Sequence, residues 1–587
     1  MAADPSRDTQ TSRRAGVARS PVRHRPFASH LRAILAPALL ALVPLFWVVD
    51  ATYRASIATL GRDQGIFQYV AWALSRGEVD YRDLRDVNGP LTHMIHWSML
   101  VLGGADEHRF RTLDLLFTGV SFALVGACLP GLVRARGPRW VERAAWAAAA
   151  WVILSAQYAM YSHWDQAQRE SFCDWFLLPA VGLLLLPPAT VRAASWRISA
   201  SGGLAAIACF GKPTFALFAA AMAASLLFDD ASTLTRPRRI ALFSIGGAIG
   251  AALPIAFLLR YGDVGAYVQI VRHDVPAVYR FIWAKSAREI FSDEAAVSAT
   301  SLAVTASACA SAMVAARALP RRALIVALLP ICAIAGVLAQ QKGFAYHFHP
   351  MTAATWLAAL VISAALWERF RHHPTAKLAA LGASAAIAWQ ATTALRASPH
   401  LKNVWVLALG ETAETRASQE YLDRYRSDDF DPWEMRQAAQ LMREATLPGD
   451  RVQSFGMDPY LLFLAQRRSA TPYIYAYDLD ATAALAGGYS NTPTKAQTTH
   501  IGWVRDTHER DLLGRVGKAA PAAFVFMDHA PLIAWQDAVI AFHACCAESA
   551  AFVDAHYRVV GAFGPYRVYL RNDLRALPAG PPLPPPE

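Results

Sequence analysis

The chain has 587 residues, of which 55% are hydrophobic and only 17% are charged, and its mean hydropathy is +0.24. This composition argues against an ordinary soluble enzyme and favours a protein that crosses a membrane several times. The formal net charge is +11, but the basic residues stand in short clusters between apolar runs, which argues against a nucleic-acid partner.

The first 32 residues are polar and rich in arginine, and no acidic residue follows Asp8 within them. We expect residues 1–32 to form a disordered basic tail on the cytoplasmic side. The apolar run at about 35–49 is followed by no convincing small-residue cleavage site. It therefore predicts an uncleaved first membrane span.

Ten further apolar runs predict membrane helices, because about 20 apolar residues in a helix cross the hydrocarbon. They lie near 109–133, 142–160, 172–188, 200–212, 214–228, 240–259, 299–316, 323–339, 351–367 and 377–395. The two short runs beside Lys212 are either two spans or one long helix with a proline break. Only a split at Lys212 leaves every arginine-rich loop on the cytoplasmic side, as such loops prefer. We predict a mainly α polytopic membrane protein with about eleven transmembrane helices over 33–398.

This topology places five connecting segments and the chain after Ser398 on the outer face. The segments are 50–108, 161–171, the turn at Lys212, 261–298 and 340–350. Beyond about residue 400, polar helical stretches alternate with runs typical of strands, such as DRVQSFG, AAFVFMD and YRVVGAFGPYRVYL. This alternation predicts a small extracytoplasmic α/β domain over 399–575, followed by an extended or disordered Pro-rich tail at 576–587.

Ionisable side chains from distant parts of the chain fall on this predicted outer face. They are Asp63, Asp83, Asp86, Arg169, Glu170, Lys212, Lys342 and His347. Charges beside hydrocarbon are costly unless they serve a purpose, so this face is the candidate functional site. The alternative is a solvated surface whose carboxylates pair with neighbouring arginines.

Three motifs on this face resemble the GT-C glycosyltransferases, in particular the bacterial branch related to protein mannosyltransferases and the lipid A aminoarabinose transferase. The first outer loop contains DQGIFQY, GEVDYRDL and DVNGPL, the second motif is FGKPTFALF, and the third is QKGFAYHFHP. The resemblance covers roughly residues 33–400. It has two departures: Asn88-Gly89 stands where the family often has Lys-Pro, and Phe348 follows His347 where tyrosine is more usual.

The resemblance implies inverting transfer of a sugar from a polyprenyl-phosphate donor to a glycan, lipid or protein acceptor. Such a transfer needs a general base, and Asp63 is the candidate, although it could instead form a structural ion pair with Arg62 or Arg169. The leaving phosphate needs positive charge. The candidates for substrate contacts are Asp83, Asp86, Arg169, Glu170, Lys212, Lys342 and His347.

A divalent cation, Mg or Mn, could bridge the phosphate if Asp86 and Glu170 supply oxygen ligands. The alternative is that these two carboxylates pair with Arg85 and Arg169. The Arg- and Ala-rich composition suggests a bacterium of high GC content and hence the inner membrane. Two other functions remain open at this point: a secondary transporter or flippase of lipid-linked glycans, and a non-catalytic subunit of polysaccharide assembly.

Overall fold

The computed structural model describes residues 27–133, 140–187, 190–229, 232–398, 412–488, 491–531 and 537–574. Most of the predicted basic tail, residues 1–26, and all of the predicted Pro-rich tail lie outside these ranges. Helix α1 (Phe27–Leu42) begins before the predicted boundary at residue 33.

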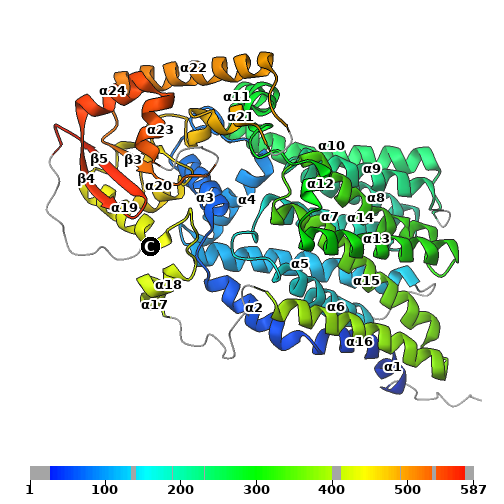
Figure 1. The fold of residues 1–587 in the computed structure, drawn as a ribbon. Coiled ribbons are helices and arrows are strands. Elements are labelled where there is room, and N and C mark those ends of the chain that lie inside the picture. The colour runs from blue at the N-terminus through cyan, green and yellow to red at the C-terminus, as the bar shows by residue number, and fades with distance from the viewer. Residues whose placement is uncertain are drawn as a thin grey trace, which may run out of the picture.

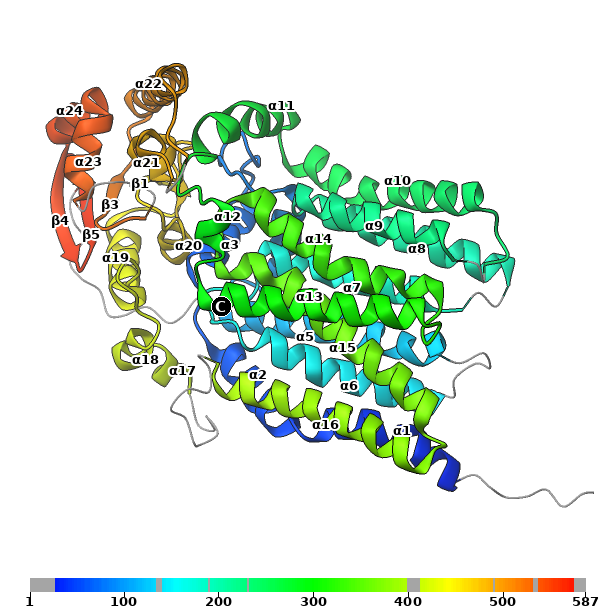
Figure 2. The same ribbon diagram turned by 45° about the vertical axis from the view of Figure 1, so that its right-hand side comes forward.

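A helix coincides with each of the eleven predicted apolar runs. The first run corresponds to α1 and α2 (Leu45–Ile57), which are bent by 46° at a break before α2. The others are α5 (Glu107–Val133), α6 (Trp140–Tyr158), α7 (Arg169–Leu185), α8 (Val191–Cys209), α9 (Ala216–Leu227), α10 (Arg236–Tyr261), α13 (Glu294–Ala315), α14 (Leu324–Gln340), α15 (His349–Phe370) and α16 (Pro374–Arg396). These helices lie side by side as one bundle (Figures 1 and 2).

Six helices in the described ranges are long and apolar enough to cross a membrane, or seven if the bent α1–α2 pair is one span. The split at Lys212 is present. Helix α8 ends at Cys209, Lys212 has an extended backbone, and Pro213 opens the short helix η1 (Pro213–Phe215) that leads into α9. Proline suits the first position of a helix, where its missing N–H is not needed.

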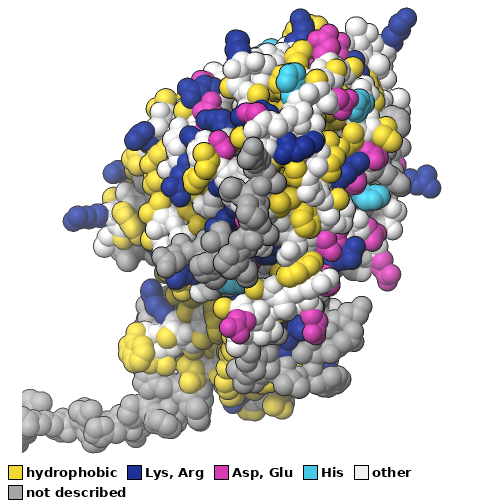
Figure 3. Space-filling view, turned by 90° about the vertical axis from the view of Figure 1, so that its left-hand side faces the viewer, with side chains coloured by type: hydrophobic (Ala, Val, Ile, Leu, Met, Phe, Trp, Pro, Cys, Tyr) yellow, Lys and Arg dark blue, Asp and Glu magenta, His cyan; other side chains and the backbone are white. Residues whose placement is uncertain are grey.

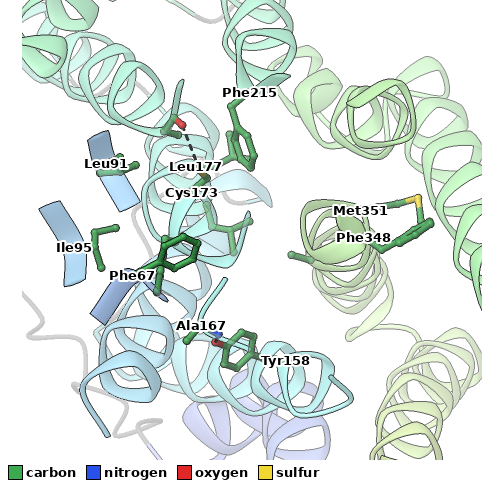
Figure 4. Packing of buried hydrophobic residues seen from close by; sticks show 14 of the residues in the cluster. Phe67, Leu91, Ile95, Tyr158, Ala167, Cys173, Leu177, Phe215, Phe348 and Met351 are labelled. Atoms are coloured by element: carbon green, nitrogen blue, oxygen red, sulfur yellow. Dashed lines mark hydrogen bonds between the residues drawn. The ribbon is translucent and has the colours of Figure 1, made fainter. Parts of the chain in front are cut away.

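The connecting segments at one end of the bundle form a layer of short helices between the bundle and the C-terminal domain (Figure 1). This outer layer contains α3 (Arg62–Ser75), α4 (Pro90–Gly103), α11 (Val264–Gln269), η2 (Ile270–Tyr279), α12 (Ala287–Ile290) and η4 (Ala345–Phe348). Phe67 of α3 and Leu91 and Ile95 of α4 belong to the same buried cluster as Cys173 and Leu177 of α7 (Figure 4). The layer is thus anchored in the core of the bundle.

The C-terminal domain contains one mixed five-stranded sheet in the order β2-β1-β3-β5-β4. The strands are β1 (Arg451–Phe455), β2 (Arg468–Ser469), β3 (Ala523–Met527), β4 (Tyr557–Phe563) and β5 (Tyr566–Arg571). Four of them confirm the predicted strand motifs, whereas the two-residue β2 was not predicted. The helices are α17 (Ala413–Arg416), α18 (Gln419–Asp423), α19 (Pro432–Ala445), α20 (Tyr460–Ala465), η5 (Ala476–Asp478), α21 (Thr482–Ala486), α22 (Lys495–Lys518), α23 (Ala538–Cys545) and α24 (Ala547–His556).

The domain is fastened directly to helix α3. A Cβ atom on Gly65 would lie only 2.4 Å from the Tyr460 ring of α20, so the close approach of the two helices requires glycine. The Tyr69 hydroxyl accepts a 2.7 Å hydrogen bond from the backbone of Ser469.

Seen from the domain end, the surface mixes basic and acidic side chains (Figure 3).

Candidate functional site

A cavity of about 300 Å³ lies where the outer layer meets the C-terminal domain. Its walls come from nine separate segments of the chain, among them the N-termini of α3 and α7. The polar and aromatic side chains that line it include Arg62, Asp63, Asn88, Trp164, Arg169, Tyr279, Lys342, Tyr346, Asp429, Tyr475 and Tyr477. The predicted outer segments are therefore brought together around one space.

Asp63, the second residue of α3, faces this cavity without a bonding partner. In the described ranges its carboxylate takes part in no hydrogen bond or ion pair, in contrast to the expected alternative of a pair with Arg62 or Arg169. Burial raises the pKa of Asp63, while the nearby charges of Arg169 and Arg62 oppose that rise. A carboxylate of this kind can accept a proton from a bound molecule.

Arg62 does not pair with Asp63 because the C-terminal domain occupies its guanidinium. Its Nε donates to Asp458 at 2.6 Å and its Nη1 donates to Asp429 at 3.0 Å. The charge on Arg62 is therefore balanced by two carboxylates, and the same contacts hold the domain against the start of α3.

Arg169 is the first residue of α7 and lines the cavity. Its guanidinium donates to the Asn88 side-chain oxygen, and its Nη2 lies 3.4 Å from the Tyr346 hydroxyl. Asn88 is oriented in turn by Asp86, which accepts from its backbone N–H at 3.0 Å and from its side-chain amide at 2.5 Å. Asn88 belongs to one of the two departures from the motif described above, and its side-chain amide positions Arg169.

Gly89, the second half of that departure, allows the loop to approach the Lys212 turn. A Cβ atom at Gly89 would lie 2.1 Å from the Phe210 carbonyl oxygen and 3.1 Å from the Gly211 carbonyl oxygen. No side chain fits there without movement of the backbone.

Lys212, Glu170 and His347 form a buried cluster beside Arg169, and none of the three lines the cavity. The Lys212 ammonium donates to the carboxylate of Glu170 and to the Gln340 side-chain oxygen. Nε2 of His347 lies 3.7 Å from Oε1 of Glu170, whose side chain is 0% exposed. Burial lowers the pKa of Lys212 to about 8, although Glu170 acts against it.

Lys342 lines the cavity and points at neutral oxygen atoms. Its ammonium donates to the carbonyl of Tyr279 at 2.9 Å and to that of Ile282, and it lies 4.8 Å from the Tyr279 ring centroid. Burial lowers its pKa to about 8. No carboxylate pairs with Lys342 within the described residues, so an anion in the cavity could do so.

Asp83 and Asp86 have different surroundings. Asp83 lies outside the cavity lining, where it accepts from Arg82 and, at 2.8 Å, from the Val79 backbone, so it stabilises the turn. Asp86 is buried beside His93 and Asn88.

The described residues contain no group of three or more His, Cys, Asp and Glu side chains that could hold a metal ion. Asp86 and Glu170 are already bonded, to His93 and Lys212. The alternative pairing with Arg85 and Arg169 is also not found, because Arg85 pairs with Asp274 instead.

Sequence reasoning missed the contribution of the C-terminal domain to the cavity. Tyr475 and Tyr477 line it with their rings stacked, 5.1 Å apart at an interplanar angle of 18°. The alternation of tyrosines in TPYIYAYD is a signal, but it could not show which side of the segment faces the membrane domain. His93, buried between two carboxylates, was missed as well.

No protein-family model and no curated protein matches this sequence. The fold is similar to ArnT from Cupriavidus metallidurans, both bound to undecaprenyl phosphate and in the apo state. In each case the TM-score is 0.51 at 12% identity, over 90% of this chain and 97% of that one. An archaeal oligosaccharyltransferase, AglB from Archaeoglobus fulgidus, aligns with a TM-score of only 0.43 at 11% identity, over 93% of this chain and 74% of that one. The likeness to ArnT and the elements described above confirm the expected architecture, a helical bundle with apolar helices long enough to cross a membrane and a small C-terminal α/β domain.

Proposed function

We propose that this protein is a membrane glycosyltransferase that moves a sugar from a polyprenyl-phosphate donor to an acceptor on the outer face of the bacterial inner membrane. The observation that carries the proposal is the unpaired carboxylate of Asp63, which shares one cavity with the cations of Arg169 and Lys342. The likeness of the fold to ArnT, solved in complex with undecaprenyl phosphate, supports a lipid-phosphate ligand.

In this mechanism Asp63 is the general base of an inverting transfer. The acceptor oxygen attacks the anomeric carbon as the bond from that carbon to the phosphate oxygen breaks. The electron pair leaves with the polyprenyl phosphate, and the acceptor proton passes to Asp63. The raised pKa of Asp63 suits this role, because a base works best when its pKa lies close to the working pH.

Arg169 and Lys342 bind the leaving phosphate. Arg169 offers a planar fork of donors, whereas Lys342 acts as a compact charge whose present partners are neutral. The buried cluster of Lys212, Glu170 and His347 lies beside Arg169 and determines the electrostatic potential there. The stacked rings of Tyr475 and Tyr477 supply a flat apolar surface of the kind that packs against a sugar ring.

The sides of the membrane follow from loop charge. The arginine-rich loops lie in the cytoplasm with the N-terminus, and the cavity and the C-terminal domain lie in the periplasm. The acceptor, a glycan, a lipid or a protein, enters from that side.

The test compares membranes that contain the wild-type protein, Asp63→Asn or Asp63→Glu. Each receives a panel of undecaprenyl-phosphate hexoses and pentoses, and transfer is followed by mass analysis of the surface glycans. We expect Asp63→Asn to lose transfer by at least about a hundredfold, while Asp63→Glu keeps part of it. Transfer by Asp63→Asn at the wild-type rate would remove Asp63 from the base role. Movement of the lipid across vesicles without transfer would instead support a flippase.

A further inference from the structure

A second cavity, of about 550 Å³, lies beside the C-terminal half of α3. It is formed where the end of α3 meets the end of α19 and strand β2, and four arginines but no acidic residue line it. We call it the arginine groove and define it by Trp72, Arg76, Arg443, Gln466, Arg467 and Arg468.

The arginine groove is distinct from the first cavity. No residue lines both. Trp72 follows Asp63 by nine positions on the same helix, which corresponds to about 14 Å at a rise of 1.5 Å per residue. A ligand in the groove is therefore too far away to take part in chemistry at Asp63.

Two of the four guanidinium groups have no polar partner in the part of the chain that the structure describes. Arg443 makes no side-chain hydrogen bond or ion pair there. Arg76 is exposed and lies over the Trp72 ring, with its guanidinium carbon 5.6 Å from the ring centroid. Because neither guanidinium group is held by a polar partner, both can turn toward a ligand. Ordering these long side chains on a ligand would cost conformational entropy.

The floor of the groove is positive for a separate reason. Arg467 is only 4% exposed, yet its donors reach neutral oxygens alone: the Thr446 hydroxyl at 2.8 Å and several backbone carbonyls, including that of Arg443 at 3.0 Å. A buried charge without a counter-charge is expensive. Burial and the charge of Arg443 lower the pKa of Arg467, and the charge of Asp450 opposes them without reversing the shift.

On the α3 side, Glu78 balances part of the positive charge, because it pairs with the groove residue Arg468. Glu78 is shared between Arg451 at 2.7 Å and Arg468 at 3.3 Å. Asp450 accepts a 2.7 Å hydrogen bond from the Leu447 backbone. The four arginines of the groove and Arg451 therefore outnumber the carboxylates of Glu78 and Asp450.

A purely structural role accounts for Arg467 but not for its neighbours. Arg467 caps the end of α19 by bonding the Arg443 and Thr446 carbonyls, which favours a cation at a helix C-terminus. Such capping needs one arginine. It leaves the unbonded guanidinium groups of Arg443 and Arg76 unexplained.

We propose that the arginine groove binds a phosphate group, carried either by a phospholipid headgroup or by a phosphorylated sugar in solution. Arginine binds phosphate through paired, charge-assisted hydrogen bonds. The Trp72 N–H already donates to Gln466 at 3.0 Å, which fixes the ring as an apolar wall for the part of the ligand next to the phosphate. The proposal stands independently of sugar transfer.

The experiment uses the full-length protein in two arms. In the first, lipid nanodiscs are doped with phosphatidic acid or with phosphate-free diacylglycerol, and native mass spectrometry counts the retained dopant. In the second, glucose 1-phosphate or glucose is titrated by calorimetry into the detergent-solubilised protein. Specific retention in the first arm identifies a headgroup, and binding in the second identifies a soluble phosphate. The absence of both overturns the proposal.

The variants are Arg443→Gln and Arg76→Gln, because neither guanidinium group makes a hydrogen bond within the described residues that the fold would lose. We expect each to weaken phosphate binding by about tenfold. Arg505→Gln is the matched control, because Arg505 pairs only with its neighbour Asp506 on α22. An equal loss in the control, or no loss in the two groove variants, would show that the arginines bind nothing specific.

Discussion

Nε2 of His93 lies 2.9 Å from Oδ2 of Asp86 in the buried interior of the outer layer. The other ring nitrogen lies 2.7 Å from Asp80, so both nitrogens face carboxylates and the ring is held as an imidazolium. Asp86 in turn orients Asn88, which accepts from Arg169 at the cavity. His93 is thus a positioning residue that reaches the candidate site through three hydrogen-bonded neighbours.

This arrangement predicts how stability depends on pH. Burial lowers the pKa of His93, but Asp80 and Asp86 outweigh it and raise the value to about 10. A raised pKa adds stability that is complete below the unfolded value of about 6.5 and is lost as pH rises towards 10. We expect His93→Gln to lower the free energy of unfolding at pH 6 by on the order of 3–5 kcal/mol. The Tm should fall accordingly.

The measurement is thermal unfolding in detergent at several pH values. The difference in Tm between the wild-type protein and His93→Gln should decrease steadily from pH 6.5 to pH 10. A difference that stays constant across that range would mean that the ring is neutral in the folded protein.

Gly89 offers a second prediction, because the space for its Cβ atom is occupied by the Phe210 carbonyl oxygen. Gly89→Ala should cost about 1–3 kcal/mol by overpacking and should displace Asn88, so that Arg169 loses its orientation and transfer falls. Gly382→Ala in α16 is the control, since nothing lies within 4 Å of its Cβ position. It should leave Tm unchanged or raise it, as alanine favours a helix over glycine. Equal effects of the two substitutions would contradict the steric argument.

The sequence predicted the bundle well because its information is local. The eleven apolar runs and the proline after Lys212 each act within a few residues, and each corresponds to a helix or a turn. The partners of the charged residues could not be predicted in this way. Arg62 bonds Asp458, almost 400 positions later, and only the folded chain brings them together.

The candidate site shows the same division. Asp63, Arg169 and Lys342 were singled out by their place on the predicted outer face, and all three line one cavity. Asp83 belongs to the same predicted face but turns away, because the tight loop uses its carboxylate for Val79. Tyr475 lines the cavity because of how the C-terminal domain is oriented, and no local sequence pattern predicts that orientation.

Lys212 and Glu170 are predicted to act as a unit. Glu170 is 0% exposed and bonds the Lys212 ammonium, so Lys212→Met should leave a buried carboxylate unpaired at a cost of about 3–5 kcal/mol. Glu170→Gln in the same chain removes that charge. We expect the double variant Lys212→Met/Glu170→Gln to recover much of the Tm lost by the single one. A double variant whose loss equals the sum of the two single losses would mean that the groups do not interact.

Asp63 provides the last prediction, on the pH dependence of transfer. Because burial raises the pKa of Asp63 while the Arg169 charge opposes the rise, the acidic limb of kcat/KM should lie above the usual carboxyl range of about 4. Transfer requires the deprotonated base, so the rate falls as pH drops through that limb. Removing the opposing charge with Arg169→Gln should move the limb to still higher pH in the residual activity. Arg169→Lys retains a cation and should leave the limb close to its wild-type position. A limb that does not respond to the loss of the Arg169 charge would assign the titration to a group other than Asp63, and with it the role of the base.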